Sequence, residues 1–122
     1  MALSPKVTRF IQSSFRSVWS LELLLLLKRD RAPATQDAIV GAMRASQLVV
    51  SQALESLVAA GLVTVSEGGE ALYAPSSDEV AKLIEETEAL FAKRPDTVRR
   101  LIVAASSPGL TAFADAFRLG RD

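Results

Sequence analysis

The first thirty residues carry apolar side chains at the spacing of an α-helix, which predicts one long helix. Ser4 and Pro5 suit its start, because the N–H group that proline lacks makes no hydrogen bond within the helix at this position. From Leu21 onwards most sides are apolar, so we expect the second half to be buried all round. Lys28 and Arg29 in the last turn suit the negative end of the helix dipole. The expected inward residues are Val7, Phe10, Ile11, Val18 and Trp19.

Two shorter helices are expected after an extended link at residues 31–34, where a proline disfavours the helical conformation in the residue before it. Thr35 is suited to cap a second helix that runs through Arg44, and Ser46 is suited to cap a third helix that runs to about Ala60. Both helices have an apolar face at helical spacing. The expected inward residues are Ile39, Val40 and Met43 in the second helix and Val50, Leu54, Leu57 and Val58 in the third.

The period of the pattern changes after Gly61, a residue type that suits the left-handed conformation at a helix end. Residues 62–65 and 71–74 favour two strands, and residues 66–70, which include two glycines, favour the turn between them. Pro75 ends this second strand. We therefore expect a small β-hairpin after the third helix.

The last part of the chain is expected to be helical. Ser76 and Glu79 match a capping box at the start of a fourth helix, and Pro95 breaks that helix or begins a new segment. Ser107 and Pro108 repeat the pattern of a cap followed by a proline, which predicts a last short helix. The apolar residues of these segments are Val80, Leu83, Ile84, Leu90 and Phe91, then Val98, Leu101, Ile102 and Val103, and finally Leu110, Phe113 and Phe117.

The stretch from Ser46 to Val63 carries a serine cap, a Val-Ser pair, a Leu-x-x-Leu core pair and the sequence Gly-Leu-Val. It resembles the recognition helix and first wing strand of winged helix-turn-helix proteins, the MarR-type and related bacterial transcriptional regulators, and the resemblance covers residues 18–75. It implies a mainly α fold with a small β-hairpin wing (α+β). It also implies a winged helix-turn-helix domain at residues 1–76, followed at residues 77–122 by C-terminal helices that serve packing or dimerisation.

The resemblance further implies a DNA-binding transcription regulator whose third helix enters the major groove. Glutamine can bond to adenine, serine can bond to several bases, and leucine can contact thymine methyl groups. An ordinary solvated helix surface explains Gln47, Ser51 and Gln52 equally well. The candidate DNA-binding residues are Arg44, for a phosphate contact, and Ser46, Gln47, Leu48, Ser51 and Gln52.

The distribution of charge departs from the pattern of this family. Residues 45–92 hold one basic side chain, Lys82, against eight acidic ones, and residues 45–76 hold no lysine or arginine. Lysine and arginine supply most of the affinity of proteins for DNA phosphates, whereas the turn of the expected wing carries Glu67 and Glu70. A second interpretation therefore stays open, in which the chain is a winged-helix protein–protein interaction module with little or no affinity for DNA.

Apolar residues on the fourth helix and aromatic residues near the C-terminus favour a homodimer, because large apolar patches are rarely left in water. Phe10, Phe15 and Trp19 are further candidates for this contact, although all these side chains can instead close the core of a single chain. The basic cluster at residues 93–100 is a solvated helix face, or it meets phosphate or the acidic 78–88 stretch of a second subunit. The candidate dimerisation residues are Leu83, Ile84, Leu90, Phe91, Phe113 and Phe117.

The composition excludes several kinds of chemistry. The chain has no cysteine and no histidine, so it lacks disulfides, thiolate nucleophiles, histidine bases and the usual zinc ligands. No cofactor motif is present, and we expect neither an enzyme nor a bound cofactor or metal. The apolar run at residues 23–27 is far shorter than the ~20 residues that span a bilayer, and charged residues follow it directly, so we expect a cytoplasmic protein.

Overall fold

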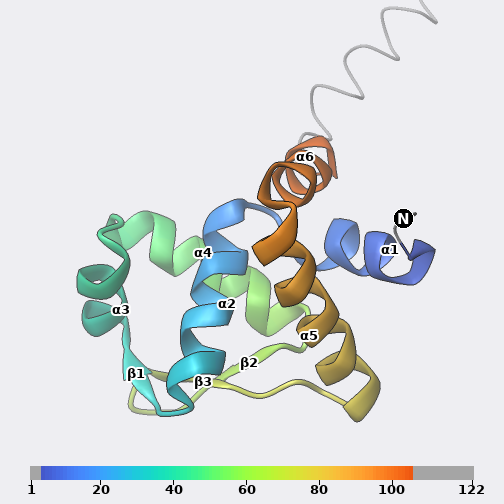
Figure 1. The fold of residues 1–122 in the computed structure, drawn as a ribbon. Helices are drawn as coiled ribbons and strands as arrows, with labels where there is room; N and C mark the ends of the chain where they lie inside the picture. Colours follow the sequence, from blue (N-terminus) through green and yellow to red (C-terminus); the bar gives the residue numbers. More distant parts are fainter. Residues whose placement is uncertain (1–3, 106–122) are drawn as a thin grey trace, which may run out of the picture.

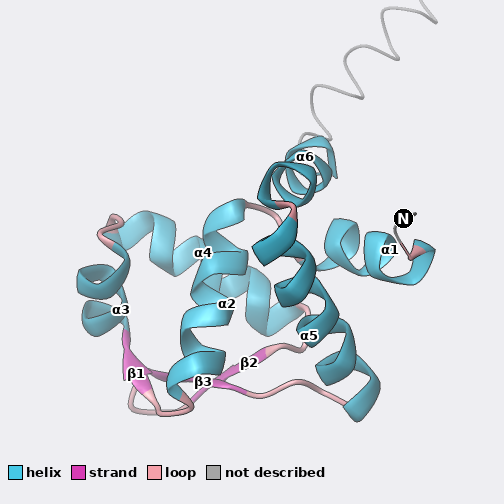
Figure 2. Ribbon diagram, in the orientation of Figure 1, coloured by secondary structure: helices cyan, strands magenta, loops and turns pink. Residues whose placement is uncertain are grey.

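The computed structural model describes residues 4–105, which are mainly helical and include a small three-stranded antiparallel sheet (Figures 1 and 2). In Figure 1, α3 lies at the left, α1 at the right and the sheet along the bottom. Among these residues, no helix is long and apolar enough to cross a membrane. In chain order the elements are α1 (Pro5–Ser14), α2 (Val18–Asp30), β1 (Ala34–Thr35), α3 (Gln36–Met43), α4 (Gln47–Ala59), β2 (Val63–Val65), β3 (Glu70–Tyr73), α5 (Asp78–Lys93) and α6 (Pro95–Ala105).

The expected long first helix is divided into α1 and α2, so that prediction is wrong. α1 ends at Ser14, and the chain passes through an extended Phe15 before Ser17 caps α2. Ser17 and Ser20 form a capping box, in which the Ser17 hydroxyl accepts from the Ser20 N–H (3.2 Å) and the Ser20 hydroxyl accepts from the Ser17 N–H (3.4 Å). The break turns Phe15 into the core, where its ring packs edge-on to Phe10 with 5.8 Å between centroids.

Helices α3 and α4 begin at the predicted caps. The Thr35 hydroxyl accepts a hydrogen bond from the Ala38 N–H (3.2 Å), and the Ser46 hydroxyl accepts one from the Val49 N–H (3.1 Å). Each bond satisfies an N–H group that the first turn of a helix otherwise leaves unpaired. Between the two helices Arg44 adopts a left-handed backbone conformation with φ of 55°, and this residue produces the tight turn.

Gly61 ends α4 and turns the chain into β2, as predicted. Its φ is 78°, its N–H donates to the Val58 carbonyl (3.1 Å), and the Leu62 N–H donates to the Leu57 carbonyl (3.0 Å). Most of the predicted inward face of α4 is buried, but Val58 is 44% exposed, so its assignment to the core is wrong. The side chain lies at the edge of the buried stripe and lines an unfilled hollow.

Strands β2 and β3 form the predicted hairpin, and β1 adds a third strand that the sequence did not indicate. The strand order is β1-β3-β2, with Ala34 opposite Ala71 and Val63 opposite Tyr73. Gly69 in the hairpin turn has φ of 84°, which suits a glycine. We expected only an extended link at β1, because a two-residue strand is too short to show alternation.

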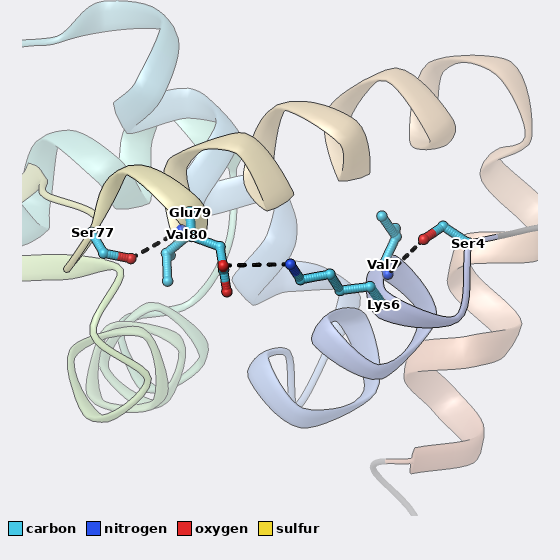
Figure 3. Close-up of polar contacts among 6 residues, drawn as sticks. All are labelled: Ser4, Lys6, Val7, Ser77, Glu79 and Val80. Carbon is cyan, nitrogen blue, oxygen red and sulfur yellow. Dashed lines mark hydrogen bonds and ion pairs between the residues drawn. The ribbon is translucent and has the colours of Figure 1, made fainter.

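Helix α5 begins one residue later than predicted. Ser77 rather than Ser76 is the cap, and its hydroxyl accepts from the Val80 N–H at 3.1 Å (Figure 3). Glu79 is then at the second helical position instead of the third, so the predicted capping box is wrong. Its carboxylate lies 3.4 Å from the ammonium group of Lys6, and this ion pair joins the first turns of α1 and α5 (Figure 3).

Helix α6 begins at Pro95, which agrees with one of the two roles expected for this proline. Val98 and Ile102 are fully buried, but Val103 is 56% exposed, so its place on the apolar face is wrong. Val103 follows Ile102 directly, and consecutive residues on a helix point about 100° apart. The last predicted helix, with Leu110, Phe113 and Phe117, lies outside the described residues.

One hydrophobic core runs through the described residues and crosses the expected boundary after residue 76. α1 contacts α5 and α6, while α2 contacts α4, α6 and β3. The Lys28 ammonium group, which is mostly buried, lies 2.7 Å from the Glu88 carboxylate and links α2 to α5. The buried Thr87 hydroxyl donates to the Leu83 carbonyl on its own helix (2.8 Å). The helices after the hairpin therefore share the core of the helices before it.

Candidate nucleic-acid interface

The exposed side of α4 carries two of the side chains that the sequence singles out for base contacts. Leu48 is 65% exposed, and the exposed Gln52 lies one turn further along the same side. Ser51 is half-buried at the edge of this side. The opposite side, which includes Val50 and Leu54, packs in the core. The helix therefore presents Leu48 and Gln52 to solvent.

The side chain of Gln47 is already engaged within the protein. Its amide nitrogen donates to a carboxylate oxygen of Asp37 (2.7 Å), and its amide oxygen accepts from the amide nitrogen of Gln36 (2.8 Å). A bidentate contact to adenine uses the same two groups. These two hydrogen bonds therefore compete with a contact between the Gln47 amide and a base. In their present form the bonds join the first turns of α3 and α4.

Arg44 and Ser46 lie in the turn between α3 and α4. The Ser46 hydroxyl is used as the helix cap, whereas the Arg44 side chain is exposed and forms no ion pair with any residue from 4 to 105. The first turn of α4 carries the partial positive charge of the helix dipole, so an anion is favoured near it. This turn is the part of the surface that suits a phosphate.

A hollow of about 420 Å³ lies between α4 and the β2–β3 hairpin. Val58 and Val65 line it and are each 44% exposed, and Leu54 and Ala59 add further apolar wall. We call this hollow, together with the exposed Leu48 and Gln52 side of α4, the α4–hairpin surface. Exposed apolar side chains around a hollow favour an apolar partner over a hydrated phosphate backbone.

One acidic side chain lines the same hollow, and two more lie in or beside the adjoining hairpin turn. Glu55 lines it, and the exposed Glu67 and Glu70 stand close in sequence to Gly69, which also lines it. None of the lining residues is a lysine or arginine. Because carboxylates repel phosphates, the α4–hairpin surface is a poor site for sequence-independent DNA binding.

The two arginines at the C-terminal end of α2, Arg29 and Arg31, do not line this surface. The Arg31 guanidinium lies 5.8 Å from the centre of the Tyr73 ring, at the end of β3 away from the hairpin turn. Burial raises the pKa of the Tyr73 hydroxyl, while the charges of Lys28 and Arg31 act in the opposite direction. Arg29 lines a different hollow, beside Trp19. Neither Arg29 nor Arg31 therefore adds positive charge beside Arg44 for binding a phosphate.

The residues proposed for dimerisation separate into three groups. Ile84 is fully buried and Leu83 is 8% exposed, so both serve the core of this chain and are not available to a partner. Leu90 and Phe91 are half-buried, and the Arg99 guanidinium lies 5.5 Å from the centre of the Phe91 ring. The last two candidates, Phe113 and Phe117, lie outside the described residues.

Sequence reasoning missed a second surface, on α2. Trp19, which we expected inside the core, is 40% exposed and lines a hollow of about 340 Å³. The expectation failed because α2 starts afresh at Ser17, so the rotation of α1 does not continue into it. The apolar run at residues 23–27 is wider than one face of a helix and held a signal of this surface; the expectation that it is buried all round is wrong, because Leu25 and Leu26 are only half-buried. The other residues that line the hollow are Glu22, Leu25, Leu26, Arg29, Ala42, Met43 and Phe91.

Comparison with known proteins finds no matching family model, no matching curated protein and no matching solved structure. Over residues 4–105, no group of three or more acidic residues is placed to hold a metal ion. The geometry and charge of the surfaces described above are therefore the features that indicate a function.

Proposed function

We propose that this chain is a winged-helix DNA-binding transcription regulator that acts as a dimer. The observation that carries the proposal is the element order α2-β1-α3-α4-β2-β3, in which a tight turn joins two helices and a hairpin follows. This order agrees with that of winged helix-turn-helix domains, whose second helix of the pair enters the major groove. In this chain that helix is α4, with Leu48 and Gln52 on its exposed side.

The charges of the α4–hairpin surface and of the turn before α4 determine how strongly each protomer is expected to bind DNA. Arg44 and the first turn of α4 suit a phosphate, whereas Glu55, Glu67 and Glu70 oppose one. Each protomer is therefore expected to bind DNA weakly, with a shallow dependence on salt. A dimer compensates, because the second half-site then binds at a high effective concentration.

Binding to a random-sequence DNA duplex pool, titrated from low to physiological salt with sequencing of the retained DNA, tests the proposal. Retention of a palindromic motif supports it. Gln52→Ala is expected to weaken binding by about 1–3 kcal/mol and relax one base preference, and Arg44→Ala to weaken binding to all sequences and flatten the salt dependence. Lys82→Ala, an exposed change on α5, is the matched control and should alter neither. Failure to retain any DNA at low salt would contradict the proposal.

The hollow between α4 and the hairpin favours a second candidate function, the binding of a protein segment. Exposed Val58 and Val65 beside Glu55 suit a segment with apolar side chains flanked by basic ones. Replacing both Glu67 and Glu70 by glutamine separates the two candidates. The double change should strengthen DNA binding, because two repulsive charges are removed, but should weaken binding of a basic protein segment.

A further inference from the structure

The exposed side of α2 has opposite charges at equal distances from a pair of leucines. Glu22 lies three residues before Leu25, and Arg29 lies three residues after Leu26. Trp19 lies a further three residues before Glu22. Because an α-helix has 3.6 residues per turn, residues at these spacings share one side, and all five line the same hollow. We call these five residues the Trp19 face.

We propose that the Trp19 face binds the same face of a second copy of this chain, with the two α2 helices antiparallel. A two-fold axis between Leu25 and Leu26 would place Glu22 of each copy opposite the partner's Arg29. A two-fold interface needs this kind of self-complementarity, because each copy contributes the same patch. The inference deepens the dimer part of the proposed function and does not depend on DNA binding.

The size and apolar character of the Trp19 face supply the affinity. Trp19 is 40% exposed, which is a large apolar area to leave in water. The hollow of about 340 Å³ beside it, flanked by half-buried Met43 and Phe91, adds apolar surface that the partner's α2 can cover. Tryptophan is among the residue types that dominate the energy of protein interfaces, and methionine adapts its shape to a partner.

The charges of the Trp19 face select the occupant. Among residues 4–105, Glu22 forms no ion pair, and Arg29 has only Asp30 at 3.7 Å, with both of those side chains well exposed. An exposed pair of this kind contributes little, so Arg29 remains able to bind a second carboxylate. An antiparallel copy offers a carboxylate to Arg29 and a guanidinium to Glu22 at once, and a lipid surface or a purely apolar peptide does not.

Charge reversal tests the pairing directly with the full chain in the absence of DNA. Light scattering should give twice the monomer mass for the wild-type protein at micromolar concentration. Glu22→Arg should yield monomers, because each introduced arginine faces the partner's Arg29, and Arg29→Glu should do the same with two carboxylates. Both changes count twice in a two-fold dimer. Arg9→Glu, an exposed reversal on α1, is the matched control and should remain dimeric.

Mixing the two monomeric variants gives the decisive result. An equimolar mixture of Glu22→Arg and Arg29→Glu should restore the dimer as a heterodimer, because each carboxylate again faces a guanidinium. Recovery in the mixture also shows that both variants are folded. A wild-type monomer, single variants that stay dimeric, or a mixture that stays monomeric would overturn the proposal. A dimer that depends on this face but binds no DNA would contradict the proposed function and would still support this interface.

Trp19 provides a second readout, because it is the only tryptophan in the chain. Its fluorescence should shift to shorter wavelength as the protein concentration rises through the dissociation constant, since the indole leaves water. Trp19→Ala should raise that constant at least roughly tenfold by light scattering, with little effect on the melting temperature. Emission that does not change between monomer and dimer would place the interface elsewhere.

Discussion

Gly61 lies at the junction between α4 and β2 in a left-handed backbone conformation, which residues with a Cβ atom adopt only at a cost in free energy. Its φ is 78°, and a Cβ at this position would lie 3.3 Å from the hydroxyl oxygen of Ser76. We expect Gly61→Ala to lower the free energy of unfolding by about 1–2 kcal/mol. Gly41 is the matched control, because it lies inside α3 with no atom within 4 Å of an added Cβ. Gly41→Ala should stabilise the protein by up to about 1 kcal/mol. Urea titration measures both, and equal destabilisation would contradict this account.

Tyr73 gives the protein a dependence on alkaline pH. Burial raises the pKa of its hydroxyl above the ordinary value of 10.0. Because the folded pKa is higher than the unfolded one, the neutral hydroxyl stabilises the fold; this contribution is fully present below about pH 10 and is lost as the pH rises through the folded pKa. Tyr73→Phe should lose less stability than the wild type across this range.

The titration of Tyr73 can be followed directly. Tyr73 is the only tyrosine in the chain, so ultraviolet absorbance of the phenolate reports on it alone. The folded protein should show a midpoint above that of the protein in urea. A midpoint equal to that of the unfolded chain would show that burial does not govern this hydroxyl.

At the scale of the elements, the break between α1 and α2 depends on two serines. Ser17 and Ser20 exchange side-chain and backbone hydrogen bonds, and the break lets Phe15 enter the core. We expect Ser17→Ala to lower the free energy of unfolding by about 1 kcal/mol, because an N–H group at the start of α2 loses its acceptor. Ser13→Ala, an exposed change on α1, should have little effect. Thermal unfolding of both variants checks the comparison, and losses of the same size would count against the capping role.

Elements whose ends are marked by local chemistry could be predicted from the sequence. Thr35, Ser46 and Gly61 mark the ends of α3 and α4, because each acts through bonds to residues a few positions away. The prediction missed the start of α5 because Ser76 and Ser77 are equally suited as caps; in the structure Ser77 is the cap, and the Ser76 N–H donates to the Gly61 carbonyl (2.9 Å). The two-residue β1 was missed because its only support is pairing with β3, far along the chain.

The surfaces were less predictable than the helices that form them. Helical spacing placed Leu48 and Gln52 outside correctly, because it depends only on the rotation of α4. Spacing failed for Val58, whose exposure depends on a hairpin that leaves a hollow beside it. It also failed for Trp19, because the phase of α2 is reset by the preceding break. The hydrogen bonds of Gln47 involve a different helix and leave no trace in the local pattern.

At the scale of the whole molecule, the helices after the hairpin complete the core that the first helices begin. Val7 and Ile11 of α1 are buried together with Val98 and Ile102 of α6, and the two helices are in contact. This packing closes most of the apolar surface of α2 and leaves the Trp19 face open. Residues 4–105 therefore share one hydrophobic core and carry two surfaces that differ in chemistry, one acidic around an apolar hollow and one built around tryptophan.

At the left-handed turn at Arg44, selection for fold stability and selection for DNA binding favour different residues. Its φ of 55° costs an arginine about 1 kcal/mol relative to a glycine. A library randomised at this position and sorted for heat resistance should be enriched in glycine. The same library sorted for retention of DNA should be enriched in arginine if the turn contacts phosphate as proposed. The difference between the enrichment of glycine in the first sort and of arginine in the second would show that the protein loses fold stability to keep a cation in that turn.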